Sequence, residues 1–389
     1  MRTMNSMDST HEPKREFSQV VEDAIRSRGI EKGGVRLAHK DSHALVHRGT
    51  GAVLYREERE QMEEGRLAEG ATRARGAGDR AEAEEADEFR TCFERDLDRI
   101  KYSKAWRRLA GKCQVFVAPD DEHLRNRMTH ALEVAQVALS IARPTGLNLA
   151  LVEAIALGHD CGHGPGGHAS EDAFEPYIEG GYDHASWGAD VILAPLNLCS
   201  EVLDGVRQHS WRLAAPRTPE GEVVSLADRL AYVAHDYDDA VRGGILSVDD
   251  LPSVVRELCG ERQSTQLRSF VADAVHTIER HGRVGISSEM GEALDTFRRF
   301  NYDRIYLRPA SNKQAERVVR MLRALVELYA DTPGRIPNIL DGTHDLPQAG
   351  SRDAYFEAVR YVSGMTDRFA IRSAVVELDY PTAELPRGV

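Results

Sequence analysis

The sequence predicts an all-α fold. From Phe89 onward, apolar residues recur three and four positions apart, which is the spacing of one face of a helix. Runs of β-branched residues that alternate with polar ones, as expected of half-buried strands, are scarce. With 389 residues, of which 41% are hydrophobic and 29% charged, the chain is long enough to bury one large core or two moderate ones.

Two helices are predicted in the first half of this region. In the first, residues 129–142, His130 shares one face with apolar side chains at helical spacing. The second, residues 147–160, is apolar nearly all round, which is typical of a buried helix. It nevertheless ends in the polar pair His159 and Asp160, and such an ending requires a chemical reason.

The later helices are amphipathic. A third helix, residues 225–240, stacks Asp228, Tyr232 and Asp236 on one face at successive turns. Two further helices are expected beyond Pro309, over residues 312–331 and 353–370.

The N-terminal part differs in composition. From Arg56 to Glu88 the chain is almost entirely charged residues, Ala and Gly, which indicates a solvated helix or a mobile linker. We therefore expect an N-terminal extension, residues 1–87, partly mobile and without chemistry of its own, and one domain over residues 88–389. A partner-binding role for the extension, which would recruit the domain to a complex, is the alternative.

Bulk properties exclude several classes of protein. The formal charge of −13 argues against nucleic acid as the main partner, because neutralising phosphates needs a concentrated basic surface. No apolar signal core or membrane span is evident, so a cytoplasmic protein is expected. The five cysteines are widely spaced and form no CxxC pair, so neither a disulfide framework nor a thiolate zinc site is indicated.

Histidine and carboxylate residues carry the predicted chemistry. His159 and Asp160 end a buried helix and are followed by CGHGPGGH, in which glycines and a proline turn the chain. An imidazole and a carboxylate are costly to bury unless they are paired or bind a metal. With His130 and Asp228 they would form a two-histidine, two-carboxylate shell, which suits Mn, Fe, Co, Ni, Zn or Mg. Such an ion polarises a phosphoryl oxygen, as phosphate-ester hydrolysis requires.

Several segments between residues 89 and 370 resemble, in the same order, the motifs of the HD-superfamily deoxynucleoside triphosphate triphosphohydrolases, the dGTPase-like proteins. They read ERDLDRIKYSKAWRRLAGKCQVFV, NRMTHALEVAQVA, GHDCGHGPGGHASED, LNLCSEVLDGVRQHS, LADRLAYVAHDYDDA and SGMTDRFA. The resemblance implies an HD-domain helical fold with a helical C-terminal region.

The resemblance also implies roles for individual residues. It makes four residues metal ligands: His130, His159, Asp160 and Asp228. It makes His168 and Glu171 a proton-transfer pair, with His163 and His184 near the phosphates. Two arginines would grip the triphosphate, Arg127 and Arg229, and three residues would surround the deoxyribose, Gln114, Tyr232 and Asp236. GPGGH stands where the family favours PPFGH, so a bulky aromatic is missing and the pocket shape is expected to differ. YDHASWGAD stands where FEHNAQSLR is usual, and this departure bears on the role of His184.

The implied activity is metal-dependent hydrolysis of deoxynucleoside triphosphates, dGTP or several dNTPs, to deoxynucleoside and tripolyphosphate. The dNTPs are expected as substrates and are the candidate allosteric activators. Manganese or another divalent ion is expected as cofactor, and a tetramer or hexamer as the homo-oligomer. The alternatives are another HD phosphohydrolase, acting on nucleoside monophosphates, cyclic nucleotides or alarmones, and a regulatory module that senses nucleotides. Preferred base, native metal and activator stay open on the sequence alone.

Overall fold

The computed structural model describes residues 31–32, 35–36, 39, 43, 45–46, 53–117, 119, 121, 123–337 and 346–386. The chain divides into two compact units, Met1–Leu54 and Tyr55–Val389. The described part of the first unit contains one short antiparallel pair, β1 (Glu31–Lys32) and β2 (Val35–Arg36). Most of the first 54 residues of the expected extension lie outside the described residues.

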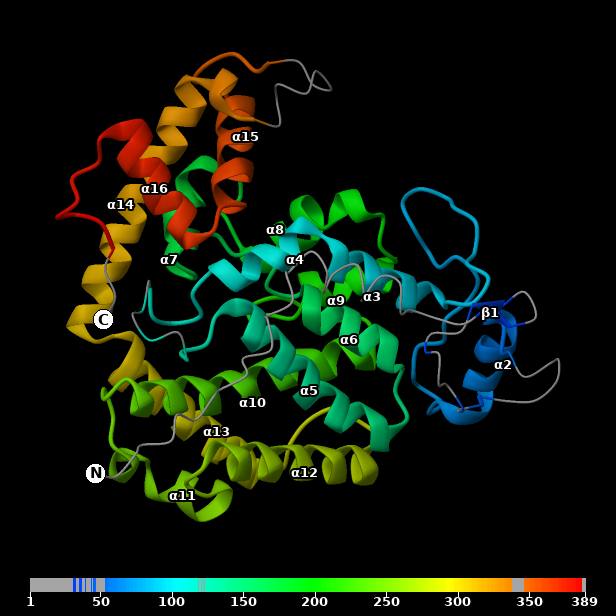
Figure 1. Ribbon diagram of the computed structural model, residues 1–389. Helices are drawn as coiled ribbons and strands as arrows, with labels where there is room; N and C mark the ends of the chain where they lie inside the picture. The colour runs from blue at the N-terminus through cyan, green and yellow to red at the C-terminus, as the bar shows by residue number, and fades with distance from the viewer. Residues whose placement is uncertain are drawn as a thin grey trace, which may run out of the picture. The chain divides into compact units, whose positions relative to one another are not determined.

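The second unit is all-α, as the sequence predicts (Figure 1). Its α-helices are α2 (Arg56–Arg66), α3 (Cys92–Tyr102), α4 (Lys104–Arg108), α5 (Arg127–Thr145), α6 (Leu149–Gly158), α7 (Ala169–Phe174), α8 (His184–Trp187), α9 (Ser200–Arg207), α10 (Pro219–Arg242), α11 (Ser253–Cys259), α12 (Gln263–His281), α13 (Ser288–Asn301), α14 (Pro309–Asp331), α15 (Arg352–Ser363) and α16 (Asp367–Leu378). The shorter helical turns are η1 (Leu109–Gly111), η2 (Glu175–Tyr177), η3 (Gly188–Ile192), η4 (Ala194–Leu196), η5 (Val248–Asp250), η6 (Tyr302–Tyr306) and η7 (Pro333–Arg335), of which η3 and η6 are π-helical.

Three helices that pack against one another, α5, α6 and α10, form the centre of the unit (Figure 1). Each begins at a residue whose side chain accepts a hydrogen bond from a backbone amide of the first turn: Asn126, Asn148 and Thr218 respectively. Helix α5 ends at Gly146, which adopts the left-handed conformation with φ of 71°. The three helices predicted over residues 129–142, 147–160 and 225–240 are confirmed.

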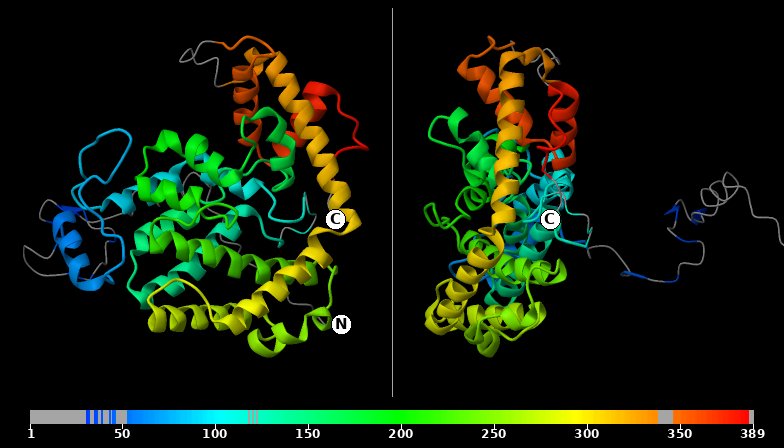
Figure 2. Two further views of the ribbon diagram at one scale, coloured as in Figure 1. Left: turned by 180° about the vertical axis from the view of Figure 1, so that it is seen from behind. Right: turned by 90° about the vertical axis from the view of Figure 1, so that its left-hand side faces the viewer.

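The C-terminal helices form a second group. Helix α14 contacts α7, α15 and α16, and Figure 2 shows the three C-terminal helices together from two further directions. The single helix predicted over residues 353–370 is wrong, because the chain breaks between α15 and α16. Gly364 follows α15, and Thr366 caps α16 by accepting from the Phe369 amide.

Two apolar cores correspond to these two groups. The larger one includes Val134 of α5, Ile155 of α6 and Leu230 of α10. The smaller one is built mainly from α14, α15 and α16, but Cys113 and Phe174 also belong to it. The smaller core therefore reaches the segment around Cys113 and helix α7, which directly follows the HDCGHGPGGH sequence.

Residues 55–91, rich in charge, pack within the second unit. The Arg80 side chain, which is 1% exposed, pairs with the buried Asp96 of α3 at 2.5 Å. The buried Glu220 carboxylate accepts from the Thr72 amide and hydroxyl, at 3.0 and 2.7 Å, and from the Asn148 amide. This stretch is therefore anchored by polar contacts, although its apolar content is low. Among the helices in the described ranges, none combines the length and apolar character that crossing a membrane needs.

Candidate active site

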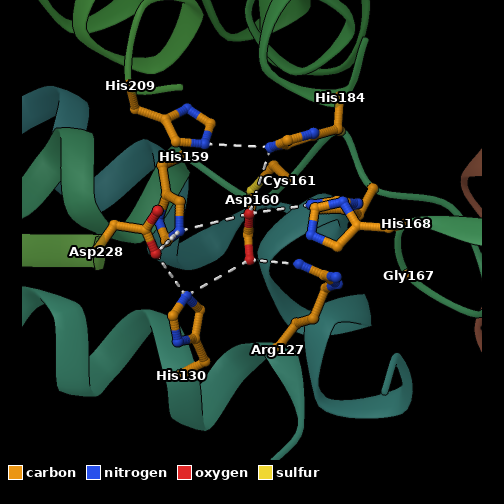
Figure 3. A network of polar contacts seen from close by, with 12 residues as sticks. Arg127, His130, His159, Asp160, Cys161, Gly167, His168, His184, His209 and Asp228 are labelled. Atoms are coloured by element: carbon orange, nitrogen blue, oxygen red, sulfur yellow. Dashed lines mark hydrogen bonds and ion pairs between the residues drawn. The ribbon is translucent and has the colours of Figure 1, made fainter. Parts of the chain in front are cut away.

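The four residues expected to bind metal come from three elements and converge. His130 lies in the first turns of α5, Asp228 lies midway along α10, and His159 and Asp160 follow the end of α6. The Nε2 atom of His130 lies 3.0 Å from Asp228 Oδ1 and 3.9 Å from Asp160 Oδ2. The Nε2 atom of His159 lies 3.4 Å from Asp160 Oδ1 and 3.8 Å from Asp228 Oδ1. Figure 3 shows these four side chains around one point, and we name them the ligand cluster.

The buried imidazole of His159 is oriented for metal binding. Its Nδ1–H donates to the Ala156 carbonyl at 2.7 Å, and a carbonyl can only accept, so the lone pair is on Nε2. That Nε2 atom is buried and has no hydrogen-bond partner among the described residues, and it faces two carboxylates. A donor set of two imidazoles and two carboxylates, in which the buried His159 Nε2 faces the carboxylates unsatisfied, fits a divalent ion.

Asp160 lies between the ligand cluster and a second group of histidines (Figure 3). Its Oδ2 accepts from Arg127 Nη1 at 2.6 Å, while its Oδ1 lies 3.3 Å from His163 Nε2 and 3.9 Å from His184 Nε2. Burial opposes ionisation, but the neighbouring His159 imidazole and the Arg127 guanidinium hold the pKa of Asp160 well below its usual range. Asp160 is therefore the carboxylate through which the two groups meet.

The second group is organised by Glu171 of α7. Its Oε1 accepts from His168 Nδ1 at 3.0 Å and from His184 Nδ1 at 2.7 Å, and it lies 3.8 Å from His163 Nδ1. Burial opposes ionisation here as well, but the hydrogen bonds from His168 and His184 hold the pKa of Glu171 far below its usual range. We name these four residues, His163, His168, Glu171 and His184, the proton cluster.

The imidazoles of the proton cluster differ in exposure and in charge. The rings of His163 and His184 stack with centroids 3.7 Å apart, and both are buried, whereas His168 is exposed. Burial and the positive charge of Arg127 hold the pKa of His163 well below its usual range. For His184, burial is outweighed by the hydrogen bond to Glu171, and the pKa is raised. A neutral ring thus stacks on one that favours the cation.

The structure adds His209, which the sequence did not assign. It follows α9, is buried, and donates from Nδ1 to the Val206 carbonyl at 2.7 Å. Its Nε2 lies 3.2 Å from His184 Nε2, and burial lowers the pKa of His209 to about 4. A neutral His209 can therefore accept a hydrogen bond at Nε2 from the Nε2–H of a cationic His184. The signal was present in LNLCSEVLDGVRQHS, since His209 lies within that motif.

The two arginines expected at the triphosphate lie in different settings. Arg127 is 2% exposed and bonded to Asp160, yet its Nε and Nη2 have no hydrogen-bond partner among the described residues. Arg229 follows Asp228 on α10, and its guanidinium lies 3.5 Å from the centre of the Trp211 ring. Trp211, which is 54% exposed, was not singled out from the sequence, and its stacking holds Arg229 by a cation–π contact.

Of the residues expected around the sugar, Tyr232 and Asp236 lie on α10, and Gln114 lies in the segment after η1. Burial raises the pKa of Tyr232 to about 12 and that of Asp236 to about 7. One Asp236 oxygen accepts from the Tyr306 hydroxyl of η6, and the other is buried without a hydrogen-bond partner in the described chain. The Gln114 side-chain oxygen is likewise buried and unsatisfied there. Tyr306 was missed, because nothing near it in the sequence indicates contact with α10.

Comparisons with known proteins agree with this geometry. Residues 127–233 match the HD domain family, and residues 284–375 match the phosphohydrolase-associated domain. A deoxyguanosinetriphosphate triphosphohydrolase-like protein of Caldanaerobacter subterraneus is 37% identical over 322 residues, which cover 81% of this chain and 93% of the relative. The chain belongs to the deoxyguanosinetriphosphate triphosphohydrolase-like family. Relatives with the same description from Clostridium perfringens, 38% identical over 75% of this chain and 87% of theirs, and from Ruegeria, 34% identical over 77% and 95%, support the membership.

In this member of the triphosphohydrolase-like family, the HD match begins at Arg127 and includes the whole ligand cluster, whose residues could hold a metal. It also includes the proton cluster and His209. The phosphohydrolase-associated match includes Tyr306 of η6 and the SGMTDRFA sequence at the start of α16. Both matched regions therefore contribute to the candidate site of this HD-domain phosphohydrolase.

Proposed function

We propose that this protein hydrolyses deoxynucleoside triphosphates, in a metal-dependent reaction, to a deoxynucleoside and tripolyphosphate. The observation that carries the proposal is the position of Asp160, whose Oδ1 lies 3.4 Å from His159 Nε2 of the ligand cluster and 3.3 Å from His163 Nε2 of the proton cluster. Cleavage between the 5′ oxygen and the α-phosphorus needs charge stabilisation and proton transfer at the same place, and this arrangement supplies groups for both.

In the proposed reaction His130, His159, Asp160 and Asp228 hold the divalent ion, which when bound supplies Lewis acidity toward a phosphoryl oxygen. The unsatisfied guanidinium nitrogens of Arg127 are donors for phosphate oxygens. Water attacks the α-phosphorus and gives up one proton as its oxygen bonds to phosphorus, and the bond from this phosphorus to the 5′ oxygen breaks.

The departing 5′ oxygen takes up a proton, and the proton cluster is proposed to provide it. His168 is the exposed member and is held by Glu171, so it can meet a substrate while its ring is kept in place. Glu171, His184 and His209 form a hydrogen-bonded chain, and a proton can pass between His184 and His209 along it. The roles of His163 and His184 near the phosphates belong to the same proposal.

At the other end of the nucleotide, Tyr232, Asp236 and Gln114 are proposed to surround the sugar. The unsatisfied oxygens of Asp236 and Gln114 can accept from a 3′ hydroxyl. The Tyr232 ring, one turn beyond Asp228 on α10, would leave no room for a 2′ hydroxyl. Deoxynucleotides should therefore be preferred over ribonucleotides.

The direct test is chromatographic analysis of the products from each dNTP, alone and in mixtures, with Mn²⁺ or Mg²⁺. Deoxynucleoside and tripolyphosphate are expected, and activity that needs a mixture would establish allosteric activation. Release of orthophosphate or pyrophosphate would instead support another HD phosphohydrolase, and binding without turnover would support a regulatory module. Size-exclusion chromatography with light scattering would test the tetramer or hexamer.

A further inference from the structure

Asp367 connects two segments of the site without belonging to either cluster. It lies in SGMTDRFA, residues 363–370, a segment to which the proposed function gives no role. Asp367 is 6% exposed, and its Oδ2 accepts from the Cys113 amide and its Oδ1 from the Gly166 amide, each at 2.9 Å. Cys113 precedes Gln114, and Gly166 lies between His163 and His168. One carboxylate thus bridges the sugar side and the proton side.

These contacts are not needed to start helix α16. Thr366 is the capping residue, and its side chain accepts from the Phe369 amide. Asp367 is the first residue of the helix, and its carboxylate points to backbone amides of other segments. Burying a carboxylate is costly, and burial raises the pKa of Asp367. If position 367 only had to occupy the first turn of α16, a neutral side chain would do so without the free-energy cost of burying a carboxylate.

The loop that Asp367 holds is confined on its other sides as well. Gly166 has φ of +77°, and a Cβ atom there would lie 2.5 Å from Val318 Cγ1 of α14. Gly167 has φ of +66°, and a Cβ atom there would lie 2.9 Å from Arg127 Nη2. The backbone between His163 and His168 therefore fits closely between α14, Arg127 and Asp367.

Lys112 forms a second polar link between the same parts of the chain. The buried Lys112 Nζ donates to the carbonyls of His163 and, at 2.9 Å, of Ser363. The Lys112 carbonyl in turn accepts from the Arg127 amide at 3.0 Å. Burial lowers the pKa of Lys112 to about 8. Two buried side chains, Lys112 and Asp367, thus join the segment before Gln114 to the His163–His168 loop and to the start of α16.

We infer that Asp367 is a positioning residue, which sets the His163–His168 loop and the Gln114 segment at fixed places relative to each other. The inference rests on the proposed function, because the consequence of misplacement is lost turnover. Asp367 acts through His168 and Gln114 and does not itself meet the substrate.

The first test asks whether Asp367 holds the Cys113 and Gly166 segments, which we call the tether, and it does not depend on enzymatic activity. Asp367→Asn keeps the shape of the side chain, but its amide nitrogen cannot accept from an N–H, so one of the two bonds is lost. Asp353→Asn is the matched control, since this exposed aspartate in the first turn of α15 undergoes the same change of charge. Hydrogen–deuterium exchange should become at least about tenfold faster in the peptides with Cys113 or Gly166 in Asp367→Asn only. Unchanged exchange in both peptides would overturn the tether.

Kinetics then test positioning against a merely structural role. Asp367→Asn should keep its metal and lose about 10–100-fold in kcat, because a misplacement of about 1 Å costs that much. In a His168→Ala background the same substitution should cost less than about threefold in kcat, because its effect on the proton-transfer step passes through His168, whereas its effect through Gln114 falls on sugar binding and therefore on KM. Equal losses in both backgrounds, or wild-type kcat in the single variant, would overturn the inference.

Two further outcomes are decisive in the same way. If Asp367→Asn does not fold, Asp367→Glu replaces it, because it keeps the carboxylate and shifts it by one methylene, and both readouts apply unchanged. If the wild-type protein hydrolyses no dNTP, the proposed function fails, while the exchange experiment still decides whether Asp367 holds the two segments.

Discussion

The ligand cluster and the proton cluster meet at Asp160 but are oriented in different ways. In the ligand cluster, His159 is fixed by a carbonyl of its own helix, and His130 and Asp228 project from long helices. In the proton cluster, His163, His168 and His184 surround one carboxylate, and the backbone that carries the first two is held by distant groups. The first cluster therefore depends on local helix geometry, and the second on how remote segments pack.

The largest effect is expected at the residue that the clusters share. Asp160→Ala, like His159→Ala in the ligand cluster, should abolish bound metal and hydrolysis together, because one ligand of four is lost and its neighbours are left uncompensated. Metal content and kcat/KM would be measured on the purified variants. His276→Ala, at an exposed position of α12, is the matched control. Full metal occupancy with full activity in either ligand variant would refute the ligand cluster.

A smaller effect, confined to turnover, is expected from the proton cluster alone. His168→Ala and Glu171→Ala should retain the metal and most of the nucleotide affinity but lose about 10²–10⁴-fold in kcat, as is typical of proton-transfer groups. Metal analysis and steady-state kinetics on the same preparations would separate the clusters. A change in KM alone would mean that these residues bind substrate and do not transfer protons.

The comparison is sharpened by Asp236, which is on the same helix as Asp228 but lies beyond the ligand cluster. Its pKa is raised to about 7 in the folded protein, from an ordinary value of 3.8, so the folded state binds the proton more tightly. Its contribution to stability is therefore complete below the ordinary value and is lost as the pH rises through about 7.

Relative to Asp236→Asn, wild-type protein should thus lose a few kcal/mol in free energy of unfolding between about pH 4 and about pH 8. Denaturant unfolding at several pH values measures this difference, and Asp295→Asn, exposed on α13, is the control. A difference that does not depend on pH would show that Asp236 is not buried as a protonated acid.

The smallest effect is expected at the sugar. Tyr232→Ala should lower the preference for dNTP over NTP by about tenfold, because the discrimination is steric, and should leave metal binding intact. Paired kcat/KM values for dGTP and GTP measure it, with Tyr102→Ala, 80% exposed on α3, as the control. Equal hydrolysis of both nucleotides by the wild type would refute the sugar pocket and favour a general nucleotidase.

The same difference between local and remote contacts explains what could be predicted from sequence. The helices that carry His130 and Asp228 follow from apolar periodicity, so their register was predictable. The contacts of His209 with His184 and of Tyr306 with Asp236 join segments far apart in the chain, and no local pattern encodes such distances. The break at Gly364 was missed because the helical periodicity continues across it.

The packing of the charged stretch, residues 55–91, determines which N-terminal truncations can be used to study the protein. Arg80 is the partner of the buried Asp96, and Thr72 supplies two of the three hydrogen bonds to the buried Glu220. A gene shortened to begin at residue 88 would encode a protein in which Asp96 loses its Arg80 ion-pair partner and Glu220 loses two hydrogen bonds; removing the partner of a buried ion pair alone costs about 3–5 kcal/mol. Loss of a binding partner in such a protein would then report misfolding and not a missing docking segment. A deletion that stops before Tyr55 keeps both anchors, and it is the one that can test whether the first 54 residues recruit a partner.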